Sequence, residues 1–321
     1  MKALVIGCGS IGRCHLRNLR ALGVTDLAGC DPSAAALKRA AAEIDGLQVF
    51  ATSEDAIDFG PDAVLVTSPT SLHVDHARLA LQWGCDLFVE KPLAASVADG
   101  EALAAAAESV DAVTLVGCNM RFHWGLREMK RVVESGVLGR LVSARLEVGQ
   151  WLPDWRPDTD YSTSYSAKRG LGGGIVLDAI HELDYAIWLF GEPSEATGLA
   201  ARLSDLQIET EDTAEFVLRF EGGPLASVHM DYVQRAYSRS CKVVGTQGTA
   251  IWDWELRVFR VFLAETGTWD VVSEPPDWEL NTMYVEEMRY FLDCVSARRQ
   301  TMNSFSAAAG TLSIALSVQR G

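Results

Sequence analysis

A glycine pattern near the start of the chain limits the possible folds more than any other feature. Residues 7–12 read GCGSIG and directly follow the apolar run Ala3–Ile6. The residues after them carry leucines at positions 16, 19 and 22, which is helical spacing. A strand, a tight GxGxxG turn and a helix in immediate succession are typical of a dinucleotide-binding unit. The first residues therefore predict a Rossmann-type sheet.

Each residue of this turn has an expected role. Gly7 makes the tight turn, Gly9 lets the backbone approach a pyrophosphate, and Gly12 lets the helix pack closely on the strand. Ser10 and Ile11 open the helix, where free N–H groups and the helix dipole favour an anion. The alternative is a plain glycine turn with no ligand.

Asp31 is the second element of the same fingerprint. It ends the next apolar run, 19 residues after Gly12. A carboxylate there binds the ribose 2′-hydroxyl and repels a 2′-phosphate, which favours NAD over NADP. Asp31 is also placed to cap a helix expected over Ser33–Glu43, and both roles are compatible.

The first third of the chain repeats the strand–helix pattern. Helical patterns over Leu72–Trp83 and Ser96–Glu108 separate apolar runs that are buried on both faces, as in parallel strands. These runs are Leu27–Cys30, Ala63–Val66, Leu87–Val89 and Thr114–Val116. We expect an α/β fold whose residues 1–118 form a doubly wound parallel sheet.

The pattern changes to strict alternation after residue 118. Apolar residues occupy every second position over 142–148, 214–220 and 226–232. Such strands are half-buried and usually antiparallel. Helices are expected over Ile175–Phe190 and around 284–295. Residues 119–321 thus predict an α+β substrate-binding and oligomerisation domain with a large, mostly antiparallel open sheet.

Charge and cysteine content exclude several classes of partner. The chain has 28 Lys and Arg against 43 Asp and Glu, a net charge of −15. We expect no nucleic acid and no anionic membrane surface as a partner, because both require a basic face. The seven cysteines form no CxxC pair and no zinc spacing, so we expect reduced thiols, no metal site and a cytoplasmic protein.

Polar residues follow two of the expected strands at the edge where ligands bind. Thr67, Ser68 and Pro69 are expected to line the cofactor cleft. His73, in the first turn of the next helix, either joins them or is an ordinary surface residue. Lys91, fixed by Glu90 and Pro92 at a strand end, either takes the proton of a substrate hydroxyl or is a surface lysine.

A second group lies in GGGIVLDAIHELD at 172–184. Asp178 and His181 are three residues apart, so on one helix they share a face. A histidine near neutral pH is a natural acid or base, and a neighbouring carboxylate orients it. The alternative is a histidine on a solvated helix face.

Taken together, these motifs resemble the Gfo/Idh/MocA family of glucose-fructose oxidoreductases and inositol dehydrogenases. The resemblance rests on GCGSIG at 7–12, SPTSLH at 68–73, EKP at 90–92, NMRF at 119–122 and the 172–184 segment. It implies that Lys91 is the catalytic lysine, that His181 is its acid–base partner and that a cis peptide precedes Pro92. Glu90 and Asn119, within these motifs, are expected to contact the cofactor.

One position departs from the family pattern. Many members carry the acidic residue four positions before the histidine, where this chain has Leu177, and Asp178 stands three before. We expect Asp178 to assist His181. The shortened spacing and the WLPDWRP segment resemble enzymes of sugar or nucleotide-sugar pathways.

The irregular segment 150–169 fits a carbohydrate ligand. Trp155 and Tyr165 are expected to stack on sugar faces, and Arg156, Lys168 and Arg121 to bind a carboxylate or phosphate. The alternative is a surface loop with aromatic anchors.

The expected function is therefore an NAD(P)-dependent oxidoreductase acting on CH–OH groups. It moves hydride between nicotinamide and a hydroxyl or keto group of a sugar, polyol or nucleotide sugar, in a homodimer or homotetramer joined through the C-terminal sheet. Two alternatives remain open. One is a non-catalytic dinucleotide-binding regulator, and the other is a sugar–sugar oxidoreductase that keeps its cofactor bound.

Overall fold

The chain folds into two compact units, as a computed structural model that describes residues 1–320. The first unit comprises Met1–Cys118 and Tyr284–Leu312, and the second comprises Asn119–Met283 and the chain from Ser313 onward. The sequence-based boundaries placed Tyr284–Leu312 in the second part. By packing, this segment belongs with the first.

A six-stranded parallel sheet forms the centre of the first unit. Its order is β3-β2-β1-β4-β5-β6, which confirms the doubly wound topology expected from the sequence. The strands are β1 (Lys2–Ile6), β2 (Asp26–Cys30), β3 (Gln48–Phe50), β4 (Ala63–Val66), β5 (Asp86–Glu90) and β6 (Thr114–Gly117).

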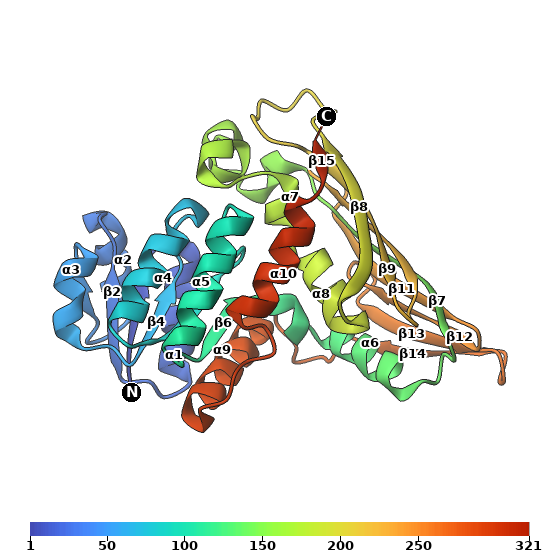
Figure 1. Cartoon of the computed structure of the whole chain (residues 1–321), viewed down its shortest axis with the longest axis horizontal. Coiled ribbons are helices and arrows are strands. Elements are labelled where there is room, and N and C mark those ends of the chain that lie inside the picture. The colour runs from blue at the N-terminus through green and yellow to red at the C-terminus, as the bar shows by residue number, and fades with distance from the viewer. Residues whose placement is uncertain (321) are drawn as a thin grey trace. The chain divides into compact units, whose positions relative to one another are not determined.

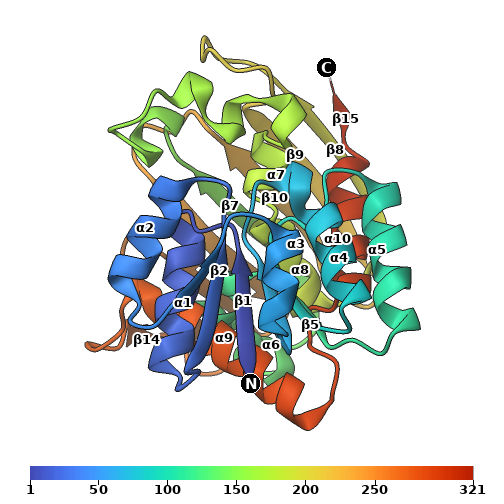
Figure 2. The same ribbon diagram turned by 90° about the vertical axis from the view of Figure 1, so that its left-hand side faces the viewer.

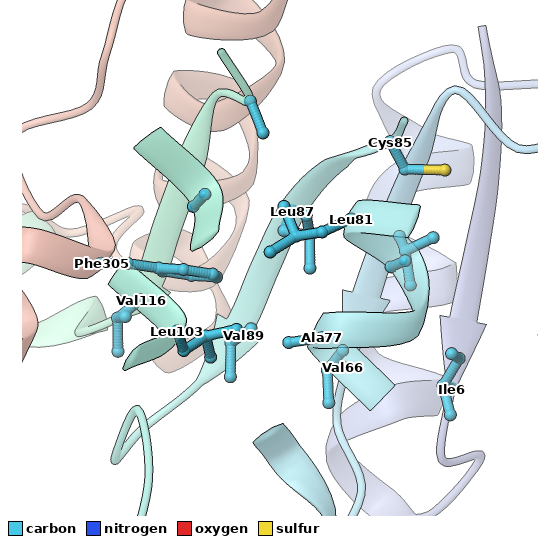
Figure 3. Close-up of a cluster of buried hydrophobic side chains, with 14 of the residues drawn as sticks. Ile6, Val66, Ala77, Leu81, Cys85, Leu87, Val89, Leu103, Val116 and Phe305 are labelled. Carbon is cyan, nitrogen blue, oxygen red and sulfur yellow. The ribbon is translucent and has the colours of Figure 1, made fainter. Parts of the chain in front are cut away.

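Helices cover both faces of this sheet (Figure 2). Buried side chains of α1 (Ser10–Ala21), α2 (Ala34–Glu43) and α9 (Leu280–Ala297) pack on one face. On the other face lie α3 (Ser53–Ala56), α4 (His73–Gln82), α5 (Val97–Ser109) and α10 (Phe305–Leu316). Figure 3 shows this second layer, where Phe305 and Leu103 meet Leu87 and Val89 of β5. The two layers explain why these strands read as unbroken apolar runs.

The second unit is built on a nine-stranded sheet of order β14-β13-β12-β11-β7-β10-β9-β8-β15. The pairs β7–β10 and β8–β15 are parallel and the others antiparallel, so the mostly antiparallel open sheet is confirmed. The strands are β7 (Leu141–Gly149), β8 (Pro193–Ala201), β9 (Thr213–Phe220), β10 (Leu225–Asp231), β11 (Ser238–Gly245), β12 (Gly248–Asp253), β13 (Val258–Leu263), β14 (Thr268–Ser273) and β15 (Gln319–Arg320).

The two faces of this sheet differ. Ala214, Phe216 and Leu218 of β9 are buried beneath helices, while alternate residues of the strand are exposed. The helices on the covered face are α6 (Trp124–Ser135), α7 (Ile175–Asp178) and α8 (His181–Phe190). In Figure 1 the sheet is seen nearly edge-on, and none of the unit's labelled helices lies against its opposite face.

The helix expected over Ile175–Phe190 is broken in two, so this prediction was wrong in detail. α7 ends at Asp178, the backbone at Ala179 leaves helical geometry (φ −99°, ψ 23°), and α8 begins at His181. Asp178 and His181 therefore do not share the face of one continuous helix.

A buried ion pair joins the short 3₁₀ helix Asn119–Phe122 to α8. The Arg121 guanidinium donates from Nε and Nη2 to the two carboxylate oxygens of Asp184, each at 2.8 Å. Only 5% and 1% of these side chains is exposed. Removing one partner of such a pair destabilises the fold, because the other partner remains as an uncompensated buried charge.

Replacing one partner of this pair should destabilise the second unit. We expect Arg121→Met to cost about 3–5 kcal/mol in urea unfolding, and the double variant Arg121→Met/Asp184→Leu to recover most of it. The matched control is Arg131→Met, which removes the exposed Arg131–Glu128 pair at 2.7 Å and should change stability by less than about 0.5 kcal/mol. Equal losses of unfolding free energy in Arg121→Met and Arg131→Met would contradict this account.

Candidate functional site

The glycine turn of the first unit has the geometry of a pyrophosphate cradle. Gly7 has φ +100°, and a Cβ on Gly12 would lie 1.9 Å from the Gly7 carbonyl oxygen, so both positions require glycine. A Cβ on Gly9 would meet nothing within 4 Å, which leaves open space above the turn. Gly9 caps α1 without a side-chain bond, so Ser10 and Ile11 begin a helix whose first amides are available to an anion. These residues fit a dinucleotide.

The end of β4 closes one side of this turn. The Thr67 hydroxyl donates to the Gly7 carbonyl at 2.6 Å, and a Cβ on Gly7 would lie 2.7 Å from the Ser68 nitrogen. The Ser68 hydroxyl lies 2.9 Å from Nδ1 of His76. Pro69 follows directly before the helical turn Thr70–Leu72. The loop 67–69 therefore lies against the glycine turn.

Asp31 is fixed by the backbone on both sides of its carboxylate. Oδ2 accepts from the Cys8 amide and Oδ1 from the Ser33 amide, both at 2.8 Å. The helix cap itself is Ser33, whose hydroxyl accepts from the Ala36 amide. Asp31 thus links the glycine turn to the start of α2.

His73 is neither a surface residue nor open to a ligand. It is 1% exposed, with Nδ1 2.8 Å from the Pro92 carbonyl and Nε2 2.9 Å from the Ser68 carbonyl. Burial lowers the pKa of His73. The ring therefore ties the 67–69 loop to the loop after Lys91.

Glu90 and Lys91 lie where β5 ends, and the Lys91–Pro92 peptide is cis, as the family resemblance implied. One oxygen of Glu90 lies 2.7 Å from Nε2 of His15, a residue of α1 that is completely buried. The other oxygen accepts from the Lys91 amide at 3.3 Å. The residue before Lys91 is thus held by the same helix that begins at the glycine turn.

The second unit contains a pocket of about 560 Å³, its open mouth included. It lies over β7, β10 and β11, next to the break between α7 and α8. Its lining residues are Val148, Gln150, Trp155, Ile175, Asp178, Ala179, His181, Asp231, Tyr237 and Arg239. Three predicted site residues, Trp155, Asp178 and His181, therefore meet in one cavity.

Tyrosines hold the carboxylate of Asp178. Tyr232, at the end of β10, donates its hydroxyl to Oδ2 at 2.5 Å, and Tyr165 is a second hydrogen-bond partner. Burial and the neighbouring carboxylate raise the pKa values of both tyrosines well above their usual range, so both remain donors. Tyr165 therefore serves the pocket through Asp178.

Two further charged groups line the pocket. Arg239 donates to Glu182 through Nε at 2.6 Å and Nη2 at 2.9 Å, and Glu182 is completely buried. Asp231 is 3% exposed and accepts from the amides of Val233 and Gln234 at 2.7 Å each. Neither residue was predicted from the sequence.

The cations expected to bind an anionic group are engaged elsewhere. Arg121 is buried against Asp184, and the Lys168 ammonium lies 2.9 Å from Glu209. The Arg156 guanidinium lies over the Tyr165 ring at 5.8 Å and is exposed. Asn119, in the same 3₁₀ helix as Arg121, is 6% exposed. None of these four side chains lines the pocket.

No group of three or more His, Cys, Asp or Glu side chains between residues 1 and 320 is placed to hold a metal ion. Across the same span, no helix combines the length and apolar character needed to cross a bilayer.

Family comparisons match both units. Residues 1–118 match the oxidoreductase family model with an NAD-binding Rossmann fold, and residues 126–251 match the GFO/IDH/MocA C-terminal domain. Myo-inositol 2-dehydrogenase of Thermotoga maritima is 30% identical over 258 residues, 77% of this chain and 74% of that protein. Inositol 2-dehydrogenase of Ralstonia nicotianae is 32% identical over 268 residues, 77% of this chain and 72% of that protein.

Solved structures show the same fold at lower identity. Levoglucosan dehydrogenase in complex with NADH superimposes with a TM-score of 0.88 at 20% identity, covering 99% of this chain and 95% of that one. UDP-N-acetylglucosamine 3-dehydrogenase of Acidithiobacillus ferrooxidans superimposes with a TM-score of 0.82 at 22% identity, covering 99% of this chain and 96% of that one. With a matching model for each unit and relatives at 30–32% identity, this chain belongs to the Gfo/Idh/MocA family of NAD-binding oxidoreductases.

Proposed function

We propose that this protein is an NAD-dependent dehydrogenase that interconverts a hydroxyl and a keto group on a sugar, polyol or nucleotide sugar. The observation that carries the proposal is the pocket of the second unit, where His181 and Asp178 lie among hydrogen-bonding side chains. The relatives named inositol 2-dehydrogenase support this substrate class.

The first unit supplies the residues for the cofactor. Gly7, Gly9 and Gly12 would hold the pyrophosphate against the amides of Ser10 and Ile11, and Asp31 would accept from the adenosine ribose. NAD, when bound, supplies the acceptor for the hydride.

Oxidation of a secondary alcohol also releases the hydroxyl proton. Lys91 of the first unit and His181 of the second are the two groups to which we assign that proton. Asp178, held by its tyrosines, keeps a carboxylate in the pocket that His181 also lines.

The remaining pocket groups suit a polyhydroxyl ring. Trp155 offers an aromatic face, and its indole N–H is buried with no hydrogen-bond partner among the described residues. Gln150 and Tyr237 add an amide and a hydroxyl. Sugars combine apolar C–H faces with many hydroxyls, so they match both features.

We further propose a cytoplasmic homo-oligomer joined through the uncovered face of the nine-stranded sheet. Leu199, Val217 and Leu225 lie on the adjacent strands β8, β9 and β10, with 65%, 43% and 51% of their surface exposed. An exposed apolar sheet face of this kind is typical of an interface. Seven free cysteines support a reducing compartment.

Removing the Lys91 amine should stop turnover while leaving cofactor binding intact. We expect Lys91→Met to lower kcat for polyol oxidation by about 10²–10⁴-fold and His181→Asn by a comparable factor, because each removes a proton carrier. Initial rates of NADH formation give kcat, and fluorescence titration gives the NADH Kd. Lys38→Met, an exposed lysine on α2, is the control and should behave as wild type.

The alternatives give different results in the same assays. A protein that binds NADH but oxidises no sugar or polyol is a regulator. One that purifies with nicotinamide absorbance and only exchanges hydride between two sugars is a sugar–sugar oxidoreductase. Wild-type turnover by Lys91→Met would refute the role of Lys91.

Asp31 should set the preference between the two dinucleotides. We expect Asp31→Asn to raise the ratio of kcat/KM for NADP over NAD by about tenfold, because the charge that repels a 2′-phosphate is lost while an acceptor remains. Asp31→Ser should raise this ratio further, because the shorter side chain leaves room for the 2′-phosphate. The measurement is initial rates with each cofactor, and an unchanged ratio in both variants would show that Asp31 does not discriminate.

Charge on the uncovered sheet face should dissociate the oligomer. We expect wild type to be a dimer or tetramer by light scattering, and Leu199→Lys/Leu225→Lys to have a smaller mass, because burying ammonium groups is costly. Leu203→Lys, in the loop after β8 and 74% exposed, controls for the added charge. A monomeric wild type would exclude this interface.

A further inference from the structure

Helix α1 contains a buried histidine that no step of the proposed reaction uses. His15 is 0% exposed and is buried together with Leu16 and Leu19, which pack on the parallel sheet. Its ring meets the Phe88 ring of β5 edge-on, with the two centroids 4.9 Å apart, and lies 6.2 Å from the Tyr284 ring of α9. An imidazole in such apolar surroundings is costly unless a polar group satisfies it. Its polar partner therefore indicates what the residue does.

That partner is Glu90, at the end of β5. Nε2 of His15 lies 2.7 Å from Oε1 of Glu90. A carboxylate oxygen only accepts, so Nε2 carries the proton and donates. Nδ1 is buried and has no hydrogen-bond partner within residues 1–320. The ring can therefore hold Glu90, but it has no second group among these residues to which it could pass a proton.

The Glu90 carboxylate extends this contact to Lys91. Its second oxygen, Oε2, accepts from the Lys91 amide at 3.3 Å, and only 14% of the Glu90 side chain is exposed. Gly117 pairs with Glu90 across the sheet, and a Cβ there would clash with the Phe88 ring at 2.7 Å and touch the carboxyl carbon at 3.4 Å. The carboxylate therefore has a fixed place between the His15 ring and the backbone of the proposed catalytic lysine.

The same contact joins two parts of the cofactor unit. α1 begins at Ser10, directly after the glycine turn, and His15 lies in its second turn. Lys91 follows β5, which is separated from β1 by β4 in the sheet. The helix whose first amides would hold the pyrophosphate therefore also holds the residue before Lys91.

We propose that His15 is a positioning residue, which acts through Glu90 to fix Lys91 relative to the glycine turn. The inference rests on the proposed dehydrogenase function, in which Lys91 handles the proton of the substrate hydroxyl. Proton transfer needs hydrogen-bond geometry, and a displacement of about 1 Å can cost about 10²-fold in rate. Because His15 is 0% exposed, its loss should lower kcat and leave ligand binding unchanged.

Removing the donor tests this role. We expect His15→Leu to lower kcat for polyol oxidation by about 10–100-fold, with the KM for the polyol and the NADH Kd unchanged. His15→Gln should recover most of kcat, because its amide nitrogen can lie near the position of Nε2 and donate to Glu90. Initial rates per folded enzyme give kcat and KM. A wild-type kcat in His15→Leu would overturn the proposal.

The matched control is Leu19→Ala, one turn further along α1. It also weakens the packing of the buried face of this helix, but it removes no hydrogen bond to Glu90. We expect its kcat per folded enzyme to equal that of wild type. A loss of kcat as large as that of His15→Leu would show a general effect of loosened packing and would refute the positioning role.

A double variant tests whether His15 acts through Glu90. If it does, His15→Leu/Glu90→Ala should have the same kcat as Glu90→Ala alone, because the link is already broken. Independent effects would multiply. A double variant that is slower than Glu90→Ala by the full factor of His15→Leu would remove Glu90 from the account.

A readout without turnover separates this inference from the proposed function. Lys91 is one of six lysines, so labelling with nitrogen-15 lysine gives few amide signals, and the one missing from Lys91→Met belongs to Lys91. We expect this signal to shift and to exchange faster with solvent in His15→Leu, and to return in His15→Gln. If wild type oxidises no sugar or polyol, the proposed function fails, and an unchanged Lys91 signal in His15→Leu would then refute the inference as well.

A second variant covers the case in which His15→Leu does not fold. His15→Asn keeps a polar side chain at this position, but its shorter amide does not reach Glu90. It should therefore lower kcat and shift the Lys91 signal as expected for His15→Leu. Equal kcat values in His15→Asn and His15→Gln would refute the proposal.

Discussion

The cofactor unit depends on one close approach between backbone atoms. A Cβ on Gly12 would lie 1.9 Å from the Gly7 carbonyl oxygen and 2.8 Å from the Thr67 hydroxyl. Because Gly12 has no side chain, α1 starts where β1 ends, and the Thr67 hydroxyl still reaches the same carbonyl at 2.6 Å. Strand, helix and the next strand of the sheet thus converge on one turn. The open space above Gly9 is a consequence of this packing, and it is the space that a pyrophosphate requires.

Most of this unit could be predicted from sequence because its determinants are local. The glycine turn, Asp31 and the polar residues after β4 and β5 each follow a strand whose apolar run is visible in the chain. The contacts that sequence reasoning missed connect distant positions. His15 meets Glu90 across 75 residues, and His73 reaches Pro92. Nothing in the spacing of either histidine shows that its ring is buried against another loop.

The second unit was predicted at the level of strands and not at the level of the pocket. Alternation located β7, β9 and β10, but alternation does not show which strands pair. Arg239 and Asp231 line one cavity because β11 and β10 flank β7. The sequence predicted that Arg121 and Lys168 bind an anionic ligand. It did not reveal their acidic partners, Asp184 and Glu209, because these lie 63 and 41 residues away. The break after α7 was missed because the sequence Ile175–Phe190 keeps a helical pattern through it.

His229 and Asp231 lie two residues apart on β10, so their side chains project from the same face of the sheet, the face that the helices leave uncovered. His229 lies opposite Glu215 of β9, and its ring nitrogens are 2.7 Å from Glu215 and 2.9 Å from Asp231. Hydrogen bonds to these two carboxylates raise the pKa of His229 to about 9, so its ring is charged at neutral pH. A second copy that covered this face would remove water from these ion pairs and strengthen them. In the proposed oligomer, the apolar side chains of the uncovered face and this ion-pair cluster would therefore both favour assembly.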